Sequence, residues 1–160
     1  MKKDTYVKTS SSLHHQHSAS LGERVLRFLP AIIMMCAIFY FSSRTGDDLN
    51  TLLPFFQKFF PGLGGFDWGH FVAYFLLGLA FIWAVTDGSY SIMHKIIAII
   101  LCLLYGLTDE FHQIYVPGRA SDWLDIRNDV IGGSIAMLFI SLPGIRGLAR
   151  RWRTSIKSRR

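Results

Sequence analysis

The stretch FVAYFLLGLAFIWAVT, at residues 71–86, contains no Asp, Glu, Lys or Arg. Three further stretches share this property, at residues 28–43, 96–108 and 130–145. A helix needs about 17–25 mostly apolar residues to cross a bilayer, and each stretch reaches that length once flanking polar residues are admitted. In a chain of 160 residues, 51% of them hydrophobic, four such spans leave no room for a separate soluble domain. The sequence therefore predicts an all-α integral membrane protein built as a four-helix bundle.

The basic residues are distributed unevenly among the segments that flank these spans. Five Lys or Arg residues precede the first stretch, one lies between the second and third, and seven follow the fourth, whereas each remaining loop contains two. Loops rich in Lys and Arg stay on the cytoplasmic side of a membrane, so both termini are expected to be cytoplasmic. Phe39-Tyr40-Phe41 lies where a signal peptidase requires small residues, so the first segment is expected to remain as an uncleaved span.

Three parts are expected along the chain. Residues 1–22 are polar and Ser-rich, which predicts a disordered cytoplasmic tail. Residues 23–145 form the four-span membrane domain, and residues 146–160 form a basic cytoplasmic tail that contacts anionic lipid. This sidedness explains the net charge of +6, and no nucleic-acid partner is expected. The expected spans cover residues 25–43, 68–86, 92–113 and 124–142.

The segment between the first two spans, residues 44–66, is not an ordinary polar loop. It is rich in Leu and Phe, carries few charges and is interrupted by Pro54 and Pro61. An apolar segment of this kind neither crosses the bilayer nor extends freely into water. It is therefore expected to lie along the outer membrane surface.

Polar residues recur at helical spacing near the outer ends of three spans. Side chains three, four or seven positions apart share one face of a helix. Short carboxylates such as Asp109 and Glu110 cannot extend to the water as Lys does, and ionisable groups at membrane depth normally face the interior of a bundle. The three polar faces are therefore expected to meet in one pocket that opens to the outside. They consist of Asp67, His70, Tyr74 and Gly78; of Tyr105, Asp109 and Gln113; and of Asp122, Asp125, Asp129 and Gly133.

The expected pocket has more acidic than basic residues. Arg119 follows a Pro-Gly turn and is the natural counter-charge, because one guanidinium can bridge two carboxylates. Like charges that are crowded in a medium of low dielectric constant cannot all stay ionised, so either some carboxylates are protonated or a cation is bound. A divalent cation is the candidate cofactor, and its candidate ligands are Asp67, His70 and Asp109.

Each of these residues also has a purely structural interpretation. Asp67 and Asp122 are favourable charges at the start of a helix, and His70 can serve as a hydrogen-bonded packing residue. The glycines on these spans are expected to allow close contacts between helices. The occurrence of polar faces on three helices together nevertheless favours a functional site. The glycines concerned are Gly78, Gly106, Gly132 and Gly133.

Four motifs occur at the outer ends of the expected spans and in the loop before the last one: Asp67-Trp68-Gly69-His70-Phe71 with Tyr74, Asp109-Glu110 with Gln113, Pro117-Gly118-Arg119, and Asp125 with Asp129 and Gly132. These motifs resemble those of the VanZ-like family of small bacterial membrane proteins. The similarity covers about residues 39–142, including Ser42-Ser43, and the family often has Asn where this chain has Asp129. The resemblance implies a multi-pass location in the bacterial cytoplasmic membrane. It also implies a link to low-level resistance to the glycopeptide teicoplanin, which is associated with the namesake of the family.

The favoured function is a role in the cell envelope, in which the pocket binds or chemically alters an anionic lipid or a lipid-linked cell-wall precursor. Two alternatives remain open, a proton-coupled transporter and a structural accessory subunit of the membrane. No nucleophile–base pair is evident, so the sequence leaves open whether the protein is an enzyme. The candidate catalytic residues are His70, Asp109 and Glu110, and the candidate ligand-binding residues are Asp67, Tyr74, Gln113, Arg119, Asp122, Asp125 and Asp129.

Overall fold

The computed structural model describes residues 21–59, 67–86, 90–145, 147–148 and 151. The described residues contain α-helices and no β-strand, so the expected all-α class is confirmed. The tails predicted at residues 1–22 and 146–160 lie almost entirely outside these ranges. The helices are α1 (Leu21–Arg27), α2 (Leu29–Ser42), α3 (Gly46–Phe59), α4 (Asp67–Val85), α5 (Ile92–Gln113) and α6 (Trp123–Phe139).

Two of the described helices are long and apolar enough to cross a membrane. They are α4, through Trp68–Val85, and α5, through all 22 of its residues. At about 1.5 Å per residue, α5 extends over roughly 33 Å, enough for the hydrocarbon core of a bilayer. Helix α2 is also apolar but has only 14 residues. Helix α6 has 17 residues and carries Asp125, Arg127 and Asp129 in its first half. Leu104 on α5 and Leu138 on α6 are more than half exposed, as expected of side chains that contact lipid.

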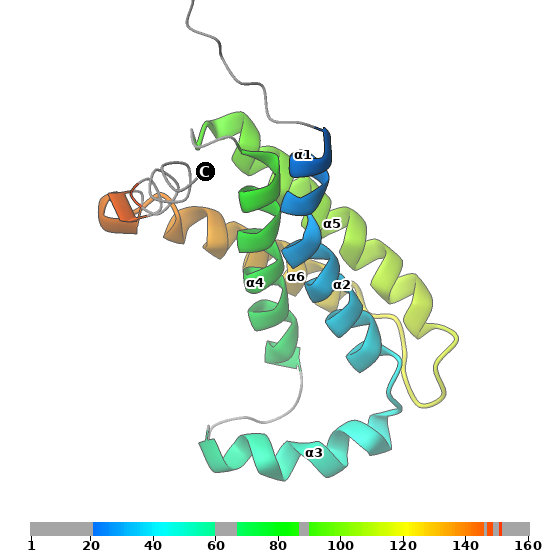
Figure 1. The fold of residues 1–160 in the computed structure, drawn as a ribbon. Helices are drawn as coiled ribbons and strands as arrows, with labels where there is room; N and C mark the ends of the chain where they lie inside the picture. Colours follow the sequence, from blue (N-terminus) through cyan, green and yellow to red (C-terminus); the bar gives the residue numbers. More distant parts are fainter. Residues whose placement is uncertain (1–20, 60–66, 87–89, 146, 149–150, 152–160) are drawn as a thin grey trace, which may run out of the picture.

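Helix α4 packs against α2, α5 and α6 (Figure 1). Its buried face includes Tyr74, Leu77 and Ile82, which are at most 2% exposed. Glycine brings α4 and α6 close together, because a methyl group at Gly78 would lie 3.2 Å from the Cα atom of Gly133. A methyl group at Gly133 would in turn lie 3.0 Å from a thiol of α5. These close contacts agree with the expectation for the glycines.

The first expected span, residues 25–43, is interrupted in the structure. Helix α1 ends at Arg27, and α2 begins at Leu29 with Phe28 as its N-cap. Pro30 explains the interruption, because its ring nitrogen has no hydrogen to donate to the carbonyl group four residues earlier. The backbone of Phe28 nevertheless keeps a helical conformation, so α1 and α2 follow one another in nearly the same direction (Figure 1).

The segment expected at the membrane surface contains α3, which lies crosswise beyond the ends of α2 and α4 (Figure 1). Thr45 and Asp48 close its first turn, since each backbone N–H of this pair donates to the other side chain, at 3.4 and 3.2 Å. The helix is strongly amphipathic. The final residues of the segment, 60–66, lie outside the described ranges. Its placement on the membrane surface remains a prediction.

Candidate functional site

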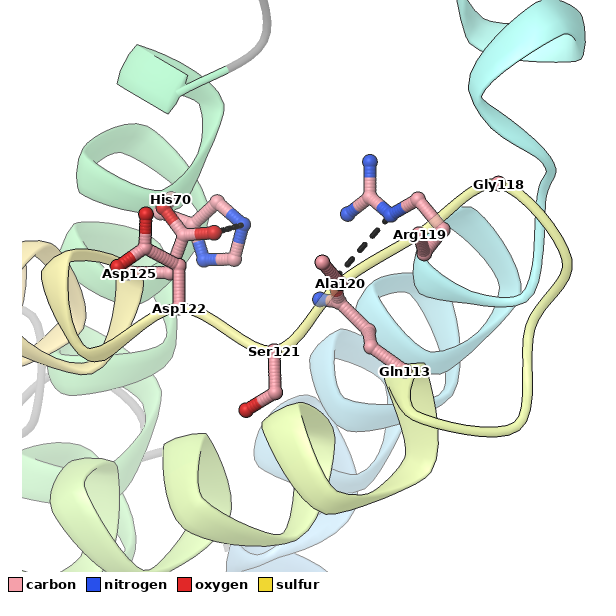
Figure 2. A pocket seen from close by; sticks show the side chains of 8 residues that line it. All are labelled: His70, Gln113, Gly118, Arg119, Ala120, Ser121, Asp122 and Asp125. Carbon is pink, nitrogen blue, oxygen red and sulfur yellow. Dashed lines mark hydrogen bonds and ion pairs between the residues drawn. The ribbon is translucent and has the colours of Figure 1, made fainter.

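A pocket of about 310 Å³ lies where α4 and α6 begin and α5 ends. The connection between α5 and α6 forms part of its wall. Figure 2 shows His70, Asp122 and Asp125 on one side of the pocket, with Gln113 and Arg119 on the other. Three helices and one loop therefore contribute polar side chains to a single pocket. The lining residues are His70, Gln113, Gly118, Arg119, Ala120, Ser121, Asp122 and Asp125.

His70 on α4 is held by two carboxylates of α6. Its Nδ1 lies 2.9 Å from Oδ1 of Asp129, which is completely buried. Its Nε2 lies 3.7 Å from Oδ2 of Asp125 at the pocket wall. The ring of Tyr74 stacks beside the imidazole, with centroids 6.3 Å apart and planes inclined by 8°. The imidazole is therefore fixed in orientation, with one nitrogen toward the protein interior and the other toward the pocket.

Asp109 and Glu110 are neighbouring buried acids at the end of α5. Oδ2 of Asp109 accepts a hydrogen bond from the Ser42 hydroxyl at 2.8 Å. The Gln113 amide donates to Oδ2 of Asp109 at 3.5 Å and to Oε1 of Glu110 at 3.3 Å. The remaining Glu110 oxygen accepts from the backbone N–H of Asp122 at 2.8 Å. The Gln113 amide thus bridges two carboxylates that would otherwise repel each other.

Arg119 does not pair with a carboxylate, which differs from the expectation that it bridges two acids. Its Nε donates to Oε1 of Gln113 at 3.2 Å, and its terminal amino groups make no hydrogen bond to any described residue. The position follows from the turn before it, in which the Arg119 N–H donates to the Val116 carbonyl at 3.1 Å. Gly118 has a φ of 73° in this turn, a conformation that glycine adopts without strain. The turn therefore directs the guanidinium into the pocket instead of onto the acids.

Asp122 lines the pocket and is also the N-cap of α6. As the N-cap of α6, its Oδ1 accepts from the backbone N–H of Leu124 at 2.8 Å. This confirms the interpretation of Asp122 as a favourable residue at a helix start. Since its own N–H donates to Glu110, the beginning of α6 is tied to the end of α5.

Three buried polar atoms of the site have no hydrogen-bond partner among the described residues. They are Oδ1 of Asp109, Oδ2 of Asp129 and the hydroxyl oxygen of Tyr74. Gly106 of α5 leaves space for one of them, because a methyl group there would lie 2.5 Å from Oδ2 of Asp129. Buried polar groups are nearly always hydrogen-bonded in proteins, so a concentration of unpartnered oxygens at one site is unusual.

The structure brings most of the candidate residues together. His70, Asp109 and Glu110 each place a potential ligand atom within 4.8 Å of the others. Asp67 is the first residue of α4, but its side chain lies outside the described part of the chain. Ser42 is an addition that helical spacing could not reveal, because its contact with Asp109 joins residues that are 67 positions apart. The Ser42-Ser43 pair in the family motif was the signal available in the sequence.

A family model described as VanZ/LLP1 matches residues 27–144. The matched region includes every residue that lines the pocket, as well as Ser42 and the buried acids beneath it. No curated protein matches the chain, and no solved structure matches it.

Proposed function

This chain belongs to the VanZ/LLP1 family, as its motifs predicted, and from that premise we propose that it binds an anionic cell-envelope molecule in the pocket beside Arg119. The protein is a multi-pass protein of the bacterial cytoplasmic membrane, a four-span bundle with both termini in the cytoplasm. The spans are α1 and α2 taken together, α4, α5 and α6, and the pocket opens at the outer surface. The ligand class is a lipid or lipid-linked cell-wall precursor that carries a phosphate or carboxylate group.

The position of Arg119 carries this proposal. Only Nε of its guanidinium is used in the hydrogen bond to Gln113, so the terminal amino groups remain available to a ligand in the pocket. A guanidinium recognises phosphate and carboxylate groups through paired hydrogen bonds. A ligand that is itself part of the membrane reaches such a site by lateral diffusion. Binding of a cell-wall precursor would also connect the pocket with the glycopeptide resistance associated with the family.

Replacing Arg119 tests the proposal, and Arg127 provides a matched control. The Arg127 side chain is exposed and donates to its neighbour Asn128, outside the residues that line the pocket. Arg119→Ala is expected to weaken binding by about 10–100-fold, since a hydrogen bond to a charged group contributes about 1.5–3 kcal/mol. Arg127→Ala should bind as the wild type does. The measurement is binding of a purified undecaprenyl-pyrophosphate-linked cell-wall precursor to detergent-solubilised protein.

The phenotype gives an independent measurement of the same proposal. Expression of the wild type should raise the teicoplanin concentration that inhibits a susceptible bacterial host, and Arg119→Ala or Asp109→Asn should remove the increase. Both variants must be present in the membrane at wild-type abundance. Wild-type behaviour of both variants, in binding and in resistance, would exclude this pocket as the binding site.

The proposed topology predicts which residues react with a reagent outside the cell. Trp123 at the start of α6 is 80% exposed and Met93 at the start of α5 is 60% exposed, at opposite ends of the bundle. In a background without the exposed Cys36, Trp123→Cys should react with a membrane-impermeant maleimide in intact spheroplasts. Met93→Cys should react only after the membrane is permeabilised. Labelling of Met93→Cys in intact spheroplasts, with Trp123→Cys labelled only after permeabilisation, would show that the orientation is opposite to the proposed one.

A further inference from the structure

Acidic residues outnumber basic ones at the pocket and beneath it. Asp109 and Glu110 come from α5, and three more acids come from the start of α6 and its first two turns. The nearby basic residues are Arg119 and Arg127, and Arg119 contacts an amide oxygen instead of an acid. Buried carboxylates in a medium of low dielectric constant require a partner of opposite charge or a proton.

From this cluster we infer a binding site for a divalent transition-metal cation, formed by His70, Asp109 and Glu110. One potential ligand atom of each residue lies within 4.8 Å of the other two. Ligands at about 2.0–2.2 Å from a shared ion lie at most about 4.4 Å from one another. Small rotations of the side chains are therefore enough to close the site around an ion. This ligand set keeps His70 and Asp109 from the set expected from the sequence and adds Glu110. The Asp67 side chain lies outside the described part of the chain.

The hydrogen bonds of Asp109 provide a second and independent indication. The residue is only 3% exposed, and Oδ2 accepts from Ser42 and Gln113. Oδ1 is equally inaccessible to solvent and accepts from no described residue. An acceptor that is buried without a partner loses its hydration and gains nothing in exchange. A cation beside Oδ1 would satisfy this atom.

The surroundings of His70 are those of a metal-binding histidine. Such a residue usually donates its second ring N–H to a carboxylate, which fixes the orientation of the ring and makes the ligand nitrogen more basic. The Nδ1 of His70 makes this contact with Asp129 at 2.9 Å. Nε2 is left for an ion, on the side where Oδ2 of Asp125 lies 3.7 Å away. Asp125 would thus be a neighbouring carboxylate for the bound ion.

The donor set indicates the class of ion. One imidazole nitrogen and two carboxylate oxygens suit Zn²⁺ or Mn²⁺, whereas Ca²⁺ and Mg²⁺ prefer sites made of oxygen alone. A site rich in thiolates would favour softer ions, but Cys102 is the buried cysteine and it packs against Gly133. Zn²⁺ and Mn²⁺ are therefore the two probes for the experiment.

The test is equilibrium dialysis of chelator-treated, detergent-purified protein against Zn²⁺ or Mn²⁺, with elemental analysis of the bound metal. His14, His15 and His17 near the start of the chain could bind metal themselves, so serine replaces them in every protein that is compared. The purification tag must also contain no histidine. The parent protein is expected to bind one equivalent of at least one of the two ions, and the bound ion should raise its melting temperature.

His70→Gln and Asp109→Asn are expected to weaken metal binding by at least ten-fold. His112→Gln is the matched control, because His112 lies on the same helix as Asp109 but contacts Ser43 at 3.1 Å and lies against the ring of Phe39, with ring centroids 4.4 Å apart. It should bind metal as the parent does. Because the two variants change different ligands, the test can still be made if one of them misfolds. Melting curves recorded without metal identify a misfolded protein. Absence of stoichiometric metal in the parent, or parental affinity in both folded variants, would overturn the inference.

The metal site and the proposed function can fail separately. Arg119→Ala should lose the envelope ligand and still bind metal, because Arg119 contributes no atom to the site. Metal binding by a protein that binds no envelope molecule would support the ion site and reject the proposed function. Binding of the envelope molecule by protein free of metal would support the function alone.

Discussion

Gly132→Ala is expected to destabilise the protein by about 1–3 kcal/mol, the usual cost of forcing an additional group into a packed core. The new methyl group would lie 2.6 Å from the backbone oxygen of Phe71 and 3.1 Å from the backbone nitrogen of Phe75. Both atoms belong to the backbone of α4, so no change of side-chain rotamer can relieve the contact. Helices α4 and α6 must move apart. The measurement is thermal unfolding in detergent.

Gly69→Ala is the control on the same pair of helices. A methyl group at Gly69 would meet no atom within 4 Å. Alanine is favoured over glycine within a helix by roughly 0.5–1 kcal/mol, so this variant should be as stable as the wild type or slightly more stable. Equal stability of the two variants would show that α4 and α6 are not in close contact at Gly132.

Asp129→Ala is expected to destabilise the protein by about 1–3 kcal/mol and to weaken metal binding by about 10–100-fold. Asp129 is completely buried and holds Nδ1 of His70 at 2.9 Å. Alanine would leave that nitrogen buried without a partner and release the orientation of the ring. Metal affinity and the melting temperature are measured on the same preparation.

Asp129→Asn separates the role of the hydrogen bond from that of the charge. The amide oxygen of Asn can accept the same hydrogen bond. This variant should therefore stay much closer to the wild type than Asp129→Ala does in both measurements. If Asn were as damaging as Ala, the negative charge, and not the orientation of His70, would be the contribution of this residue.

The sequence predicted those features of the fold that depend on the residue pattern within one helix. The extents expected for the spans at residues 68–86 and 92–113 agree closely with α4 and α5. The first follows from one apolar run, and the second from a shorter run whose helical spacing continues through Asp109 and Gln113. The arrangement of His70, Asp109 and Asp129 near one another was expected from their spacing along three helices. The four-span bundle and the function of these residues remain predictions.

Contacts between remote parts of the chain were not predictable in this way. Ser42 reaches Asp109 only because α2 packs beside α5, and helical spacing contains no information about that neighbour. The hydrogen-bond partner of Arg119 also differs from the one expected. Charge alone favoured an acid, whereas the turn at Gly118 directs the guanidinium to Gln113. A backbone conformation decided this contact, and the number of charges did not.

The unequal lengths of α5 and α6 have a consequence for the lipids around the protein. At about 1.5 Å per residue, the 22 residues of α5 extend over roughly 33 Å and the 17 of α6 over roughly 25 Å. A short hydrophobic segment is accommodated by local thinning of the bilayer. In the proposed topology, in which α6 is a span, the membrane should therefore be thinner beside α6, and outer-leaflet headgroups would lie closer to the entrance that Asp122 and Asp125 border.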